Sequence, residues 1–273
     1  MITQRTPCEP GIGAEPGIAL EKFRLHSFEF SSFPPKLPFA VLGRSDIHAW
    51  RLNLRSCALQ AHDLIPLLSQ DELDRMARFH FEPDRQDFAV ARGTLRTLLG
   101  LYLGAAPQDL RFSYSKHGKP FLALPYSETG LRFNLSHTRG SMLFAVCRDH
   151  QIGVDIEKLR ADFNVEEIAL KFFSASERCA LMSLPQAGRP AAFFHCWTRK
   201  EALVKARGDG LSFPLGLFDV SMLAVDRDVT LVTRPDPTEA QQWRILNLSV
   251  PAGYAAAVAV GYASHRNSAG YFW

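Results

Sequence analysis

The sequence predicts an α+β fold, in which groups of strands and groups of helices share a core. Short stretches of alternating apolar and polar residues are typical of strands, and longer stretches between them carry helix start and stop signals. The order strand, helices, strands occurs twice along the chain. With 273 residues, 47% of them hydrophobic, the chain is long enough for one large domain or two small ones with a sizeable core.

Charge and cysteine content narrow the class of protein. A formal net charge of +3 is not the basic footprint of a nucleic-acid partner. The five scattered cysteines include no Cys-x-x-Cys pair, so they indicate neither a zinc site nor a disulfide framework, and a reducing compartment fits. No apolar stretch reaches membrane-spanning length, and no leader pattern opens the chain. We expect a cytoplasmic protein without membrane or nucleic-acid partners.

The N-terminal region precedes the first regular element. Residues 1–45 show no clear period and contain many glycines and prolines, so we expect a loosely structured extension. Residues 28–33 are rich in aromatic side chains, which would allow that part to lie along the body of the protein. Alternation over residues 47–54 predicts the first strand. Ser69 and Glu72 form a capping box that opens a helix.

A long helix is predicted from Pro83 to Leu103, because apolar residues recur along one side of it. Arg85, Arg92 and Arg96 give this helix a basic side. A solvated face explains these arginines as well as a role in binding phosphate does. The residues alone leave both interpretations open.

A short strand and a turn follow. Residues 110–114 predict the strand, and Gly118, Lys119 and Pro120 predict an exposed turn that carries a cation. A plain hairpin loop is the simpler interpretation of this spacing.

The next strand, over residues 131–138, carries polar groups on one side. Alternation places Asn134 and Ser136 together, opposite the apolar residues of the strand. Ser136 and His137 are adjacent and therefore point to opposite faces, which makes a hydrolase nucleophile–base pair improbable. Residues 141–146 predict the following strand.

The second half repeats the coarse order of the first. Residues 165–172 predict a helix, and Ser174 offers a cap for another helix over residues 178–184. Pro190 opens a long helix that Gly208 ends. Four strands are predicted toward the C-terminus: residues 218–223, 229–233, 243–250 and 254–260. Residues 263–273 are expected to form a tail.

Two carboxylates share one face of a predicted strand. Val154 and Ile156 alternate with Asp155 and Glu157, so both acids project from one side, roughly 6.5–7 Å apart along the strand. Carboxylates in this arrangement repel each other unless water screens them or a cation lies between them. Mg²⁺ takes carboxylate oxygens, keeps several waters and prefers partners that carry phosphates.

The second long helix adds an acid and two bases. Trp197, Glu201 and Lys205 recur every four residues and share a face. An ordinary surface Glu–Lys pair is one interpretation, with a contribution of about 0.2–0.5 kcal/mol. The other is that Glu201 supplies a third oxygen to a metal while Lys200 and Lys205 meet phosphates.

Together, the segment 153–157 and the segment 197–205, about forty residues later, resemble the signature pair of the 4′-phosphopantetheinyl transferases. The length is similar to the larger, surfactin-synthetase-activating (Sfp-like) type. The resemblance implies a monomer of two similar α+β halves related by a pseudo-twofold axis, each a small, mostly antiparallel sheet packed with helices. We place these halves at residues 46–150, on the coenzyme A phosphate and adenine side, and at residues 151–262, with the metal and catalytic motifs.

Site roles follow from the same resemblance. It implies Mg²⁺, or Mn²⁺ in its place, held by Asp155, Glu157 and Glu201. Glu201 would act as the base and Lys205 would stabilise phosphate charge, so these two would be the catalytic residues. Trp197 is assigned to packing. Coenzyme A would contact residues from both halves: Arg92, Lys119, Pro120, Ser136, His137, Asp155, Lys200 and Lys205.

The implied reaction transfers the 4′-phosphopantetheine group of coenzyme A to a serine of an acidic apo acyl or peptidyl carrier protein and releases adenosine 3′,5′-bisphosphate. Two other classes stay open. A nucleotidyl transferase or phosphohydrolase could use the same acids, although no P-loop is present. A non-catalytic module that binds coenzyme A or carrier proteins is the third class, although a binder gains little from three carboxylates beside phosphates.

Overall fold

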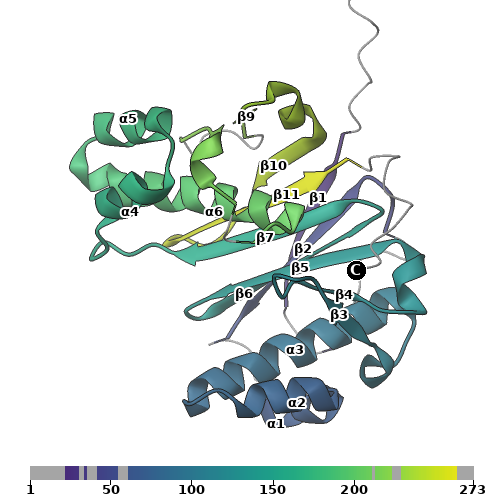
Figure 1. Ribbon diagram of the computed structural model, residues 1–273. Helices are drawn as coiled ribbons and strands as arrows, with labels where there is room; N and C mark the ends of the chain where they lie inside the picture. The colour runs from purple at the N-terminus through teal and green to yellow at the C-terminus, as the bar shows by residue number, and fades with distance from the viewer. Residues whose placement is uncertain are drawn as a thin grey trace, which may run out of the picture.

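The helices and strands form four layers (Figure 1). The computed structural model describes residues 22–30, 34–35, 42–54, 61–210, 213–222 and 229–262. A long helix covers the outer face of each of two sheets, and the inner faces of the sheets pack on each other. This arrangement confirms the α+β class. The pseudo-twofold relation between the halves stays a prediction.

The first sheet has the strand order β1-β2-β6-β5. Its strands are β1 (Arg24–Glu29), β2 (Asp46–Asn53), β5 (Leu131–Thr138) and β6 (Ser141–Arg148). β1 runs parallel to β2, and the other neighbours are antiparallel. Helix α3 (Glu82–Leu103) lies on the outer face, where its buried leucines pack against the sheet.

Smaller elements complete the first half. They are α1 (Ala61–Leu64), α2 (Gln70–Ala77) and the hairpin of β3 (Phe112–Tyr114) and β4 (Pro120–Leu122). The predicted capping box is confirmed, since Ser69 caps α2 and the Glu72 carboxylate returns to the Ser69 amide at 3.2 Å.

The second sheet has the order β10-β11-β7, with both pairs antiparallel. Its strands are β7 (Gln151–Lys158), β10 (Trp243–Asn247) and β11 (Tyr254–Gly261). Helix α6 (Arg189–Arg207) covers the outer face and ends at Gly208, whose positive φ of 81° suits glycine.

The remaining elements surround α6. Helices α4 (Val165–Phe172) and α5 (Ala175–Ser183) pack against it, and Ser174 caps α5 as predicted. Strands β8 (Phe218–Val220) and β9 (Leu231–Thr233) form a small ribbon. The predicted strands in this region are present but shorter, because β8, β9 and β10 each pair over only three to five residues.

The expected loose N-terminal extension is corrected at one place. Residues 24–29 form β1 and hydrogen-bond in parallel to β2. The strand was missed because a parallel edge strand depends on its neighbour for register, and its flanking glycines and prolines suggested a loop. Residues 1–21 and the expected tail over 263–273 lie outside the described residues.

Candidate functional site

Strand β7 positions two acids on the face that α6 covers. Val154 and Ile156 lie in the core between the two sheets, so the alternation predicted from sequence is confirmed. Asp155, on the opposite face, is buried. Gly153 lets the helix approach, because a Cβ there would lie 2.2 Å from the Ala202 carbonyl oxygen. The close contact brings α6 directly over the acids.

The opposing helix face completes a shallow cavity of about 390 Å³ between α6, β5 and β7. Glu201 and Lys205 point into it from α6. Residues from all three elements line it: Leu135, Ser136, His137, Asp155, Glu157, Trp197, Glu201 and Lys205.

A triangle of hydrogen bonds joins the three elements in this cavity. The Lys205 Nζ atom donates to Asp155 Oδ1 at 2.7 Å and to Ser136 Oγ at 3.0 Å. The Ser136 hydroxyl in turn donates to Asp155 Oδ1 at 2.8 Å. The residues that sequence predicted as separate motifs therefore converge on one carboxylate oxygen.

Strands β5 and β7 belong to different sheets, and side chains hold them together. The Val154 amide donates to Asn134 Oδ1 at 2.9 Å, and the Lys158 amide donates to Thr138 Oγ1 at 3.2 Å. The Thr138 hydroxyl also donates to Glu157 Oε2 at 3.2 Å. These bonds satisfy backbone amides of β7 that have no partner on a neighbouring strand, and they hold β5 and β7 together at the base of the cavity.

Electrostatics disfavour three ionised carboxylates in this cavity. Burial, then repulsion from Asp155, raises the pKa of Glu201 to about 7, while Lys205 opposes the shift. Burial and Asp155 also raise the pKa of Glu157. A bound cation would relieve this repulsion and favour the ionised forms.

Among the residues that line the cavity, two buried carboxylate oxygens lack hydrogen-bond partners, Asp155 Oδ2 and Glu201 Oε1. Buried acceptors normally have a partner, so these atoms fit a hard cation with oxygen ligands. Asp155, Glu157 and Glu201 are not, however, among the described groups that bring three ligand atoms within 4.8 Å of one another. The carboxylate oxygens are therefore ligands of the type that Mg²⁺ prefers. They lie farther apart than the ligand atoms of a metal site that is formed entirely by protein side chains.

Comparison with known proteins identifies the family. A model of the 4′-phosphopantetheinyl transferase superfamily matches residues 151–259, and a model of the N-terminal part of 4′-phosphopantetheinyl transferases matches residues 55–148. The 4′-phosphopantetheinyl transferase HetI of Nostoc sp. is 38% identical over 83% of this chain and 92% of that protein. This chain belongs to the 4′-phosphopantetheinyl transferase superfamily.

A second relative agrees with an Sfp-like transferase. The 4′-phosphopantetheinyl transferase Sfp of Bacillus subtilis is 30% identical over 57% of this chain and 66% of that protein. A solved holo-[acyl-carrier-protein] synthase from Thermotoga maritima matches 41% of this chain and 62% of its own at 19% identity, with a TM-score of 0.32.

Within the described residues, no helix is long and apolar enough to cross a membrane.

The structure corrects the expected role of Lys200 in phosphate binding. Its side chain is 0% exposed, and its Nζ lies 2.8 Å from Glu177. It also donates to the carbonyls of Leu215 and Phe218, at 2.8 and 2.6 Å. Five residues along a helix rotate a side chain by about 140°, so Lys200 and Lys205 face opposite ways.

Three other residues that were expected to contact coenzyme A lie outside this cavity. Arg92 is buried 3.2 Å from Glu72 and donates to the Tyr114 hydroxyl. Lys119 donates to the carbonyls of Ile152 and Lys205, at 2.9 and 2.5 Å, and so caps the C-terminal end of α6. Pro120 begins β4. Neither cation is free to meet a phosphate without leaving these partners.

His137 and Trp197 both line the cavity. His137 is exposed and close enough to Asp87 on α3 to affect its pKa. Trp197 packs as expected, with its ring centroid 5.7 Å from that of Phe193, and also lines the cavity. Sequence reasoning did not single out Thr138 as a group that holds Glu157. The available signal was its period-2 spacing from Ser136, which places both on the β7 side.

Proposed function

We propose that this transferase moves the 4′-phosphopantetheine group of coenzyme A to a serine hydroxyl of apo acyl or peptidyl carrier proteins in a Mg²⁺-dependent reaction. Adenosine 3′,5′-bisphosphate is the other product. The observation that carries the proposal is the convergence of Ser136, Asp155, Glu201 and Lys205 on one cavity between β5, β7 and α6.

The cationic and hydroxyl groups of the cavity hold the pyrophosphate of coenzyme A. Lys205 is held on Asp155 and Ser136, so its charge is already placed before substrate binds. Such a preorganised cation stabilises charge that develops on the transferred phosphoryl group. His137 is exposed at the cavity rim, where it is accessible to a phosphate oxygen.

Asp155, Glu157 and Glu201 hold the metal, which supplies charge neutralisation on the phosphates when bound. The serine oxygen of the carrier forms a bond to the β-phosphorus as the bond to the departing bisphosphate breaks. Glu201 takes the serine proton, because its carboxylate points into the cavity and a bound cation would keep it ionised.

Intact-mass spectrometry of an apo carrier protein tests the reaction directly. Incubation with this protein, coenzyme A and Mg²⁺ should add the mass of one phosphopantetheine group. EDTA should abolish the gain. Asp155→Ala should also abolish it, because Asp155 anchors both Lys205 and Ser136.

Asp162→Ala is the matched control, because Asp162 is exposed and lies outside the cavity. This variant should transfer at the wild-type rate. Full turnover by Asp155→Ala in Mg²⁺ would contradict the metal assignment. If the folded wild-type protein adds no mass to acyl or peptidyl carrier proteins, the proposed reaction is contradicted.

A further inference from the structure

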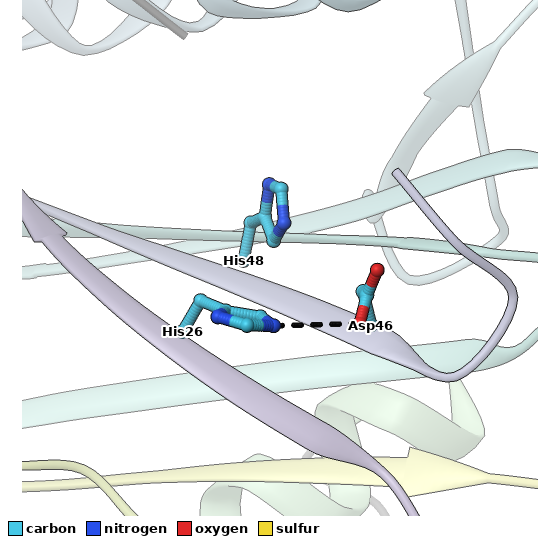
Figure 2. A group of neighbouring side chains, drawn as sticks. All are labelled: His26, Asp46 and His48. Atoms are coloured by element: carbon cyan, nitrogen blue, oxygen red, sulfur yellow. Dashed lines mark hydrogen bonds and ion pairs between the residues drawn. The ribbon is translucent and has the colours of Figure 1, made fainter. Parts of the chain in front are cut away.

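The parallel pairing of β1 with β2 gathers a second group of ligand-type side chains, far from the transferase cavity in sequence. The register places His26 beside His48 and Arg24 beside Asp46. Because side chains alternate along a strand, residues two apart in each strand share a face. Figure 2 shows His26, Asp46 and His48 projecting from the same side of the two strands.

The three side chains are close enough to share one ion. One ligand atom from each lies within 4.8 Å of the other two, the only such group of three in the part of the chain that the structure describes. His26 Nε2 is 3.4 Å from Asp46 Oδ1, and the two imidazole centroids are 5.3 Å apart. Two imidazoles and a carboxylate form a donor set that suits Zn²⁺ with one position left for water.

A neighbouring hydroxyl fixes the orientation of the buried ring. His48 Nδ1 lies 2.6 Å from the Tyr102 hydroxyl of α3, which also accepts a hydrogen bond from Trp50 Nε1 at 2.9 Å. A metal would therefore bind His48 through Nε2. Histidine ligands in metal sites commonly hold their second nitrogen in such a bond.

We propose that His26, Asp46 and His48 bind a transition-metal ion of the Zn²⁺ class and that this ion clips β1 to β2. The site is distinct from the oxygen-rich cavity of the proposed transferase reaction. It lies within the first sheet and uses a strand that precedes both matched family segments.

Arg24 competes with the metal for the carboxylate. Its Nε lies 2.7 Å from Asp46 Oδ1, but its side chain is 66% exposed and can turn into solvent. His26, with 31% of its side chain exposed, gives the ion a route from solvent. Arg24→Gln should therefore bind Zn²⁺ more tightly than the wild-type protein, because it removes a positive charge without removing a ligand.

Zn²⁺ titration of the metal-free full-length protein, in excess Mg²⁺, tests the site. Excess Mg²⁺ fills the sites that are built from oxygen ligands, but it does not compete for a site that contains imidazole ligands. We expect one equivalent of Zn²⁺ to bind, with at least about tenfold weaker binding in His26→Gln, since loss of even a supporting residue costs 10–100-fold. Co²⁺ should give the visible absorption of a tetrahedral site in wild type but not in His26→Gln.

His62→Gln is the matched control, because His62 is 77% exposed and outside the group. It should bind Zn²⁺ as the wild type does. His26→Gln is preferred to a His48 variant because His26 lies at the surface edge, and circular dichroism verifies that it is folded. No Zn²⁺ binding, or equal binding by wild type and His26→Gln, would show a hydrogen-bond cluster only and overturn the proposal.

Discussion

Lys200 and Lys205 show how side-chain environment decides the role of a residue. Both lie on α6, yet Lys200 is sealed against Glu177 whereas Lys205 reaches across to Asp155. The Glu177 carboxylate also accepts from the Val220 amide at 2.9 Å, so it anchors β8 to the same cluster. One lysine therefore supports the fold and the other is available for the chemistry.

Replacing each lysine by methionine should separate these roles. Lys200→Met should lower the free energy of unfolding by about 3–5 kcal/mol, because it leaves a buried carboxylate without its cation. Lys205→Met should lower stability less, because Lys205 is 30% exposed and Asp155 keeps the hydrogen bond from Ser136. It should lose transfer by about 10²–10³-fold, as expected for a lost charge-stabilising donor. Urea unfolding and the mass-spectrometric transfer assay measure the two effects. A Lys200→Met variant that is stable but inactive in transfer would contradict this structural role and support phosphate binding by Lys200.

The raised pKa of Glu201 predicts that the free energy of unfolding of the metal-free protein depends on pH. Its pKa moves from an ordinary value of 4.5 to about 7. The folded state thus holds a proton that the unfolded state has released, and the free energy of unfolding falls as pH rises through this window. Glu201→Gln should remove up to about 3 kcal/mol of this decline.

Urea unfolding in EDTA, between about pH 5 and about pH 8, measures the decline. Glu201→Gln should be more stable than wild type at the upper pH and inactive in transfer. Glu128→Gln, at an exposed carboxylate, should follow the wild-type curve. An unchanged pH profile in Glu201→Gln would mean that this carboxyl is not the group that titrates.

At the scale of elements, the α6–β7 contact determines the site. Gly153 has no side chain between strand and helix, and a Cβ there would meet backbone atoms of both Ala202 and Ala206 at 2.2 Å. Backbone cannot turn aside as a flexible side chain can. The glycine of the first motif is thus required by the helix that carries the second motif.

Gly153→Ala should move α6 away from β7 and weaken both stability and transfer. Overpacking of this kind typically costs about 1–3 kcal/mol. Gly188→Ala is the control, since nothing lies within 4 Å of an added Cβ there and its φ is −87°. Thermal unfolding and transfer rates test the pair. A fully active Gly153→Ala would show that the spacing of α6 and β7 is not needed for the site.

At the scale of the whole molecule, three cores join the layers into one unit. One core lies beneath α3, one beneath α6, and the third between the inner faces of the two sheets. The third core takes residues from β2 and β6 on one side and from β7, β10 and β11 on the other. Lys119 adds a polar link from the first half to the end of α6.

This shared core predicts one cooperative unfolding transition. Separating the halves would expose the buried apolar faces of both sheets, so neither half should unfold alone. Differential scanning calorimetry should give equal calorimetric and van't Hoff enthalpies. A calorimetric enthalpy about twice the van't Hoff value would indicate two independent units.

The sequence by itself determined the local structure and the family. Alternation gave β5 and β7 with correct faces, caps gave the starts of α2 and α5, and the two motifs gave Asp155, Glu157, Glu201 and Lys205. These features depend on residues close in the chain, where periodicity and capping act.

Only the tertiary structure decided which side chains meet. Lys200 and Arg92 form buried ion pairs, and Lys119 caps the C-terminal end of α6. The pairing of β1 with β2 makes His26 and His48 neighbours. The partners in each case are 15 or more residues apart or lie on another element. Local patterns carry no information on such partners, since the packing of layers and the register of a parallel strand pair select them.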